Sequence, residues 1–115
     1  MEQINEIYKT LLELKLVDNE ADFCAVFCKR HVKFLKDSNY HNFNPTLEVL
    51  LNIRGMIKHL YDTYAADRQG NYISHAETDL QRCLSLITKA IEDHHSDTLI
   101  KLTEVILHRP EMQEF

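Results

Sequence analysis

The sequence predicts an all-α fold, in which five or six helices form a bundle. The chain of 115 residues has the length of one domain, and its two Gly and two Pro are too few for the turns of an all-β protein. Apolar residues recur at spacings of three and four, and a hydrophobic content of 44% is enough to form a core. We expect a helical unit at residues 1–66 and a C-terminal helical hairpin at residues 67–115, packed together as a single compact domain.

The first two helices are predicted at about Gln3–Leu16 and Glu20–Phe27. Asp18 or Asn19 is a suitable N-cap for the second helix, because a short side-chain oxygen can accept a hydrogen bond from a free backbone N–H of the first turn. The second helix should face inward through Phe23, Cys24 and Phe27.

A third short helix is predicted at about Arg30–Asp37, followed by the irregular segment Ser38–Asn44. The apolar residues of the helix, which should hold it against the core, are Val32, Phe34 and Leu35. In the irregular segment, Tyr40 and Phe43 are expected to be buried and to fix the loop.

The fourth helix is predicted at about Pro45–Ala66, with Asn44 as its cap. Its apolar stripe comprises Leu47, Leu50, Leu51, Ile57, Leu60, Tyr61 and Tyr64. Gly55 lies in the middle of this helix, where a glycine costs about 1 kcal/mol relative to alanine. Either the close approach of another helix or a kink would explain it.

The remaining helices follow a linker predicted at Asp67–Tyr72. Ser74 and Glu77 have the spacing of a capping box and mark the start of the fifth helix. A sixth helix at about Thr98–Leu107 is apolar around most of its circumference, which indicates burial on more than one side.

Charge is distributed unevenly along the chain, whose net charge is −5. Residues 1–28 are acidic, whereas residues 29–42 carry four basic side chains and one acidic one, besides two histidines. Because salt screens charges beyond about 8–10 Å, the local charge decides whether a phosphate backbone is attracted. A solvated helix face and contact with an acidic protein are the alternative interpretations.

Several residues in the N-terminal half match a known pattern. The large residue Phe23 precedes the small residue Cys24, Phe34 anchors the next helix, and residues 44–51 read NPTLEVLL. In these features residues 18–53 resemble the helix-turn-helix of phage repressor and Cro-type regulators, and the resemblance extends over about residues 4–64. The sequence departs from that family at the turn, where Cys28 replaces the usual glycine.

The resemblance implies a small DNA-binding regulator, whose third helix would lie in the major groove. The implied DNA contacts are Lys29, Arg30, His31, Lys33, Lys36, Asn39 and Asn42. It also implies a homodimer, joined through the C-terminal helices. The alternative is a protein-interaction adaptor that has the helix-turn-helix scaffold but does not bind DNA, and the acidic net charge favours this alternative.

No catalytic motif is present, so we expect neither an enzyme nor a cofactor. Cys24, Cys28 and His31 lack a second ligand pair for structural zinc, and a site at His94-His95 with His75 or His108 is disfavoured because adjacent helical histidines diverge. We therefore expect no metal.

The chain has no apolar stretch of the roughly 18–20 residues that cross a bilayer, and no signal peptide at its N-terminus. Three cysteines, an odd number, indicate reduced thiols that serve as small apolar side chains. We expect a cytoplasmic protein with no membrane contact.

Overall fold

The computed structural model describes residues 1–67 and 74–107, and the side chains of residues 1–67 and 74–95. It confirms the all-α prediction, since no strand occurs in these ranges. The elements are α1 (Glu2–Glu13), α2 (Glu20–Phe23), the π-helix η1 (Cys24–Cys28), α3 (Phe34–His41), α4 (Leu47–Asp67) and α5 (His75–Leu107).

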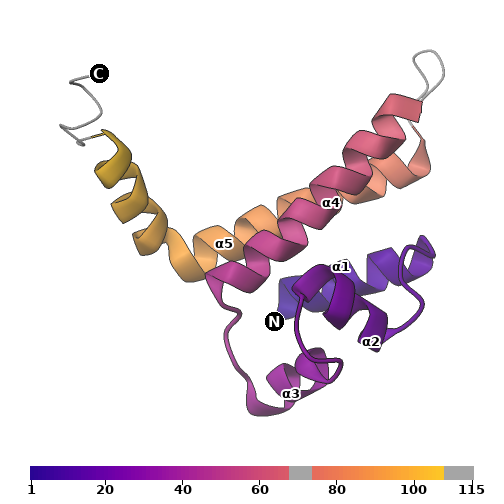
Figure 1. The fold of residues 1–115 in the computed structure, drawn as a ribbon, viewed down its shortest axis with the longest axis horizontal. Coiled ribbons are helices and arrows are strands. Elements are labelled where there is room, and N and C mark those ends of the chain that lie inside the picture. The colour runs from indigo at the N-terminus through magenta and orange to yellow at the C-terminus, as the bar shows by residue number, and fades with distance from the viewer. Residues whose placement is uncertain (68–73, 108–115) are drawn as a thin grey trace.

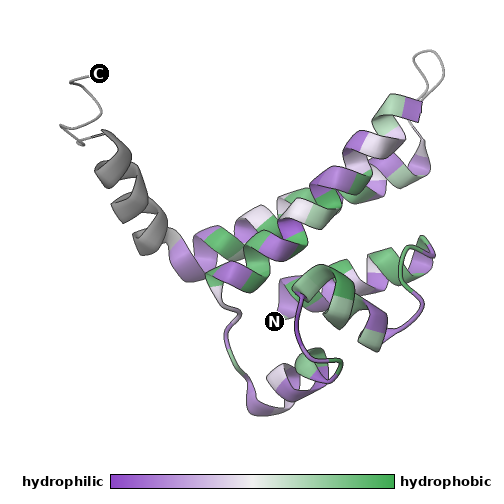
Figure 2. Cartoon of the chain, viewed as in Figure 1, coloured by the Kyte–Doolittle hydropathy of each residue, from purple (hydrophilic) through white to green (hydrophobic). Residues whose placement is uncertain are grey.

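The helices α4 and α5 form a long antiparallel hairpin, as Figure 1 shows. α1 packs against α5, and η1 packs against α4. The hairpin therefore crosses the predicted boundary between residues 66 and 67, and the two expected units share one core. The buried apolar residues come from every helix: Ile4, Ile7, Leu11, Phe23, Cys24, Phe27, Cys28, Leu35, Val49, Leu50, Ile53, Ile57, Leu80, Cys83, Ile87, Ala90 and Ile91. Figure 2 shows how apolar and polar residues alternate along these helices.

Two predicted helix starts are confirmed by their hydrogen bonds. The Asn19 Oδ1 atom accepts from the Asp22 N–H at 2.9 Å, so Asn19 is the N-cap of α2. At the start of α5, Ser74 Oγ accepts from the Glu77 N–H at 3.2 Å, while Glu77 Oε2 accepts from the Ser74 N–H at 2.8 Å. This reciprocal pair is the capping box expected from the sequence.

Three helices end in a residue with left-handed backbone, and none of these residues is glycine. They are Lys15 with φ 62°, Lys29 with φ 54° and Asn42 with φ 56°. After Lys15, the Leu16 N–H donates to the Leu11 carbonyl at 3.0 Å, which satisfies a carbonyl of the last helical turn. At each of these three positions the Cβ atom is sterically unfavourable in left-handed backbone, whereas glycine has no Cβ.

Details of the long helices differ from the prediction. Of the two explanations for Gly55, the close approach of another helix is wrong, because nothing lies within 4 Å of the position that a Cβ would take. Leu51 and Tyr64, which were assigned to the buried stripe, are exposed. The predicted linker at residues 68–73 lies outside the described residues.

The fifth and sixth predicted helices are both present and form one element, α5, in which they meet at a kink. Its only non-helical residue is His95, with φ −137° and ψ 21°, so a kink stands where the sequence predicted a break. The His95 Nε2 atom lies 2.8 Å from the Pro45 carbonyl oxygen, which accepts its hydrogen bond and joins the kink to the segment that leads into α4.

A polar contact supplements the packing of α1 on α5. The Arg82 guanidinium donates to Thr10 Oγ1 at 3.0 Å, and Thr10 Oγ1 donates to the Glu6 carbonyl at 3.1 Å. Thr10 is buried, so this hydrogen bond satisfies a hydroxyl that is out of reach of water.

The three cysteines are free and buried, as the sequence indicated. Burial raises the pKa of the Cys28 thiol to about 12 and that of the Cys83 thiol to about 11. Both thiols are therefore protonated at neutral pH and pack as apolar groups. None of the described helices has the length and apolar character to cross a membrane.

We predict that Lys15→Gly raises the free energy of unfolding by about 0.5–1 kcal/mol, because glycine adopts the left-handed conformation without a Cβ penalty. Urea denaturation measures the change. Lys15→Ala is the control, since it removes the same charge and keeps the penalty. Equal stabilities of the two variants would contradict the prediction.

We also predict that stability falls as the pH rises above 9. The pKa values of Cys28 and Cys83 rise on folding from 9.0, so the unfolded chain loses these protons at a lower pH than the folded chain. Stability from this source is complete below pH 9 and is lost as the pH approaches 11 to 12. Urea denaturation at several pH values measures the effect. The free energy of unfolding should fall less steeply with pH in the variant that combines Cys28→Ala with Cys83→Ala than in the unmodified chain.

Candidate nucleic-acid interface

The basic segment, residues 29–36, begins where η1 ends. Lys29 is left-handed, and the Arg30 N–H donates to the Cys24 carbonyl at 3.0 Å. The Asn52 side chain of α4 donates to the Cys28 carbonyl at 3.2 Å. The chain therefore leaves the core from a point that is fixed by hydrogen bonds to the backbone.

The predicted bounds of the third helix, Arg30–Asp37, are wrong. The helix is α3, Phe34–His41, and Lys33 is its N-cap residue. The left-handed turn at Lys29 redirects the chain, so helical geometry resumes only after an irregular stretch at residues 29–33. In that stretch the His31 Nδ1 atom accepts from the Lys33 N–H at 3.2 Å.

Leu35 is the main anchor of α3. It is 1% exposed, and its N–H donates to the Cys24 Sγ atom at 3.4 Å. Phe34 is half-buried and packs against the same core. Val32, which the sequence assigned to the inner face, is 47% exposed, because the helix begins after it and its direction is not set by helical periodicity.

The predicted cations are exposed to different degrees. Lys29, Lys33 and Lys36 are exposed, and their ammonium groups have no partner among the described residues. The Arg30 guanidinium lies 3.2 Å from the Glu48 carboxylate of α4. Three lysines are therefore available for an external anion, whereas Arg30 already has an internal one.

The predicted asparagines occupy a different environment from the lysines. Asn39 exchanges hydrogen bonds with Asn5 at 2.8 and 3.0 Å and also donates to the Leu35 carbonyl. Asn39 and Asn42 line an open hollow of about 430 Å³ together with Glu2 and Glu6 of α1. Met1 and Lys9 also line this hollow, so its charges are of both signs and do not single out a phosphate.

The expected burial of Tyr40 and Phe43 is wrong. Tyr40 is 83% exposed and Phe43 is 57% exposed. Both lie at the C-terminal end of α3, beside the lysines in sequence, and the sequence analysis did not include them in the site. The sequence contains a signal for this exposure. In SNYHNFN both aromatic residues are flanked by polar residues, so they do not belong to an apolar stripe of a helix.

One known protein family matches most of the chain. The model of DUF6626, a family of unknown function, matches residues 4–100. The chain belongs to this family. No curated protein and no solved structure matches it. The DUF6626 match begins in α1 and ends in α5, so it includes the basic segment as well as the hairpin.

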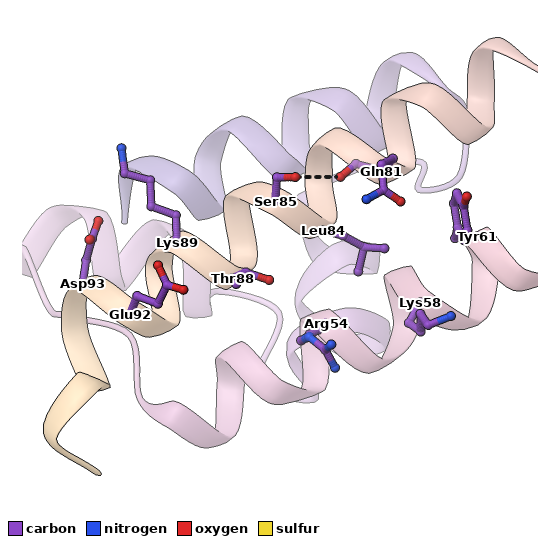
Figure 3. Close-up of a pocket in the computed structure, with 10 residues that line it drawn as sticks. All are labelled: Arg54, Lys58, Tyr61, Gln81, Leu84, Ser85, Thr88, Lys89, Glu92 and Asp93. Carbon is purple, nitrogen blue, oxygen red and sulfur yellow. Dashed lines mark hydrogen bonds between the residues drawn. The ribbon is translucent and has the colours of Figure 1, made fainter. Parts of the chain in front are cut away.

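A second depression in this DUF6626 chain lies between α4 and α5, with a volume of about 720 Å³. Figure 3 shows the residues that line it: Arg54, Lys58, Tyr61, Gln81, Leu84, Ser85, Thr88, Lys89, Glu92 and Asp93. Its charges are of both signs, and Lys58 already forms an ion pair with Asp62 at 2.6 Å. The lining contains neither His nor Cys, and its serine hydroxyl, Ser85 Oγ, donates to the Gln81 carbonyl at 3.3 Å.

Among the described side chains, no group of three or more His, Cys, Asp or Glu lies close enough to hold a metal ion. Cys24 and Cys28 face the core, and burial raises the pKa of each thiol, which disfavours the thiolate that a metal requires. His108 lies outside the described residues.

We predict that Leu35→Ala lowers the free energy of unfolding by about 2–4 kcal/mol, because it leaves a cavity at the buried anchor of α3. Val32→Ala should change it by less than about 0.5 kcal/mol, because Val32 is 47% exposed and its truncation encloses no cavity. Urea denaturation measures both changes. A large loss of unfolding free energy in Val32→Ala would contradict this and would indicate that Val32 packs on the inner face.

Proposed function

We propose that this chain is a small DNA-binding regulator that contacts the phosphate backbone through its basic segment, residues 29–36. The observation that carries the proposal is the exposure of Lys29, Lys33 and Lys36, whose ammonium groups have no partner among the described residues, in a chain of net charge −5. In an acidic protein, three exposed cations within eight residues create a local attraction for a polyanion.

The contacts differ from those that the helix-turn-helix resemblance implied. Lys36 is the only implied cation within α3, so the proposal does not depend on a recognition helix that reads bases in the major groove. Arg30 and His31 flank the three lysines, and Arg30 would exchange its contact with Glu48 for a phosphate. Asn39 and Asn42 are omitted, because the Asn39 amide already donates to Asn5 and Leu35 and both residues line a hollow of mixed charge.

The regulator is proposed to act in the cytoplasm without catalysis, which is consistent with its free, buried thiols. The predicted homodimer would form through the C-terminal helices, of which the side chains of residues 96–107 lie outside the described part of the chain. Dimerisation would double the number of lysines that meet one DNA molecule, and so strengthen binding.

A protein-interaction adaptor is the second candidate. Val26, Val32 and Leu51 are exposed apolar residues on or next to the elements that carry the basic segment. An adaptor that binds through them would contact a protein partner and would not retain DNA.

We predict that combining Lys33→Ala with Lys36→Ala weakens DNA binding and reduces its salt dependence. The slope of log affinity against log salt should become less steep by about two, because each phosphate contact contributes about 0.9 to it. Fluorescence anisotropy of a labelled duplex of about 20 base pairs, titrated between about 50 and 200 mM salt, measures the slope.

The matched control combines Arg54→Ala with Lys89→Ala, which removes two exposed cations from the α4–α5 groove and should leave the slope unchanged. Asp37→Asn, which removes the acid directly after the segment, should strengthen binding. Equal losses in both double variants would mean that total charge governs retention. Absence of any salt-dependent retention by the unmodified chain would favour the adaptor.

A further inference from the structure

Three aromatic rings meet at the end of α3. The Tyr40 and His41 ring centroids lie 5.0 Å apart and edge to face, and the His41 and Phe43 centroids lie 5.2 Å apart with only 20° between their planes. We call Tyr40, His41 and Phe43 the ring cluster.

The backbone holds the ring cluster in place. Asn42 is left-handed, and the Phe43 N–H donates to the Ser38 carbonyl at 3.0 Å. This turn folds the chain back and brings the Phe43 ring alongside that of His41. The arrangement therefore follows from a hydrogen-bonded helix end, and the rings are presented to solvent in a defined position.

The ring cluster is exposed although it could bury a large apolar area. Tyr40 is 83% exposed and Phe43 is 57% exposed, whereas Phe23 and Phe27 are buried in the core. Large rings gathered on a surface mark interaction sites more often than single exposed aliphatic residues do. The chemistry around the rings indicates which ligand they suit.

The neighbouring charges favour a polyanion. Lys36 and Tyr40 are four residues apart, so they lie on one face of α3, about 6 Å apart along its axis at 1.5 Å per residue, and Lys33 is the N-cap residue that precedes the helix. Asp37 is the acid on the same exposed face, and Lys29 adds a further cation in the preceding segment. The face thus combines cations with flat apolar rings.

We infer that this face binds single-stranded nucleic acid, with the lysines on phosphates and unpaired bases stacked on Tyr40 and Phe43. Cationic grooves with exposed aromatic rings suit single strands, because each unstacked base offers a ring face. A duplex encloses its base faces and can meet only the lysines. The inference rests on the proposed nucleic-acid binding and specifies its substrate class.

The test compares fluorescein-labelled oligothymidylate of about 15 nucleotides with a duplex of the same length, by anisotropy at low salt. Combining Tyr40→Ala with Phe43→Ala should weaken single-strand binding at least about five-fold per ring, and should leave duplex binding within about two-fold. Tyr40→Phe keeps the ring and should retain the original affinity. Tyr64→Ala removes a remote exposed tyrosine of α4 and should have no effect. Circular dichroism checks that helical content is unchanged.

A second measurement separates stacking from charge. The chain has no tryptophan, so Tyr40→Trp introduces a single reporter at the ring cluster. Oligothymidylate should quench its emission, whereas heparin, a polyanion without bases, should bind without quenching it.

Each alternative outcome has a distinct meaning. Equal binding of single strands and duplex, with no effect of the ring variants, would overturn the inference and leave the proposed function standing. Failure of both oligonucleotides to bind would overturn both. Ring-dependent binding of polyglutamate in preference to oligothymidylate would overturn the inference in favour of an acidic protein partner.

Discussion

The burial of one seam of α5 against two other helices is the constraint on which this structure depends. Leu80, Cys83 and Ile87 are fully buried, and α5 packs against both α1 and α4. Each fully buried aliphatic side chain contributes about 1.5–3 kcal/mol, whereas a helix cap contributes about 1 kcal/mol. The shared seam therefore outweighs the local signals at the helix ends. The hydrogen bonds from Arg82 to Thr10 and from His95 to Pro45 then fix how α5 lies along its neighbours.

Because the most extensive helix contacts join α4 to α5, α1 to α5 and η1 to α4, α3 is left at the edge of the molecule (Figure 1). It is attached through Leu35, by the partial burial of Phe34, and by the pair of hydrogen bonds between Asn5 and Asn39. Its remaining surface is free to carry lysines and aromatic rings that add little to stability. A rigid core with a small peripheral element is a common arrangement for binding, because the element can vary without disturbing the fold.

Much of the candidate site could be anticipated from the sequence, and the exceptions have physical causes. The exposure of the lysines followed from their charge, since an unpaired ammonium group is very costly to bury. The start of α3 could not be foreseen, because it depends on left-handed backbone at Lys29, a conformation that few residues other than glycine adopt. The exposure of Tyr40 and Phe43 was missed for a related reason. Their positions depend on where α3 ends, at left-handed Asn42. The apolar character of Tyr40 and Phe43 does not indicate where that end lies.

The sequence by itself determined that the chain is helical, where α2 and α5 begin, and that Phe23, Cys24 and Phe27 face inward. These properties depend on short-range periodicity and on capping side chains that act within one turn. Only the tertiary structure decided which helices pair. The apolar seams of α1, α4 and α5 are interchangeable in composition, so their pairing depends on how shapes and loop lengths fit over the whole chain. It also decided that Gly55 faces open space and that Arg30 meets Glu48, because both outcomes depend on residues distant in sequence.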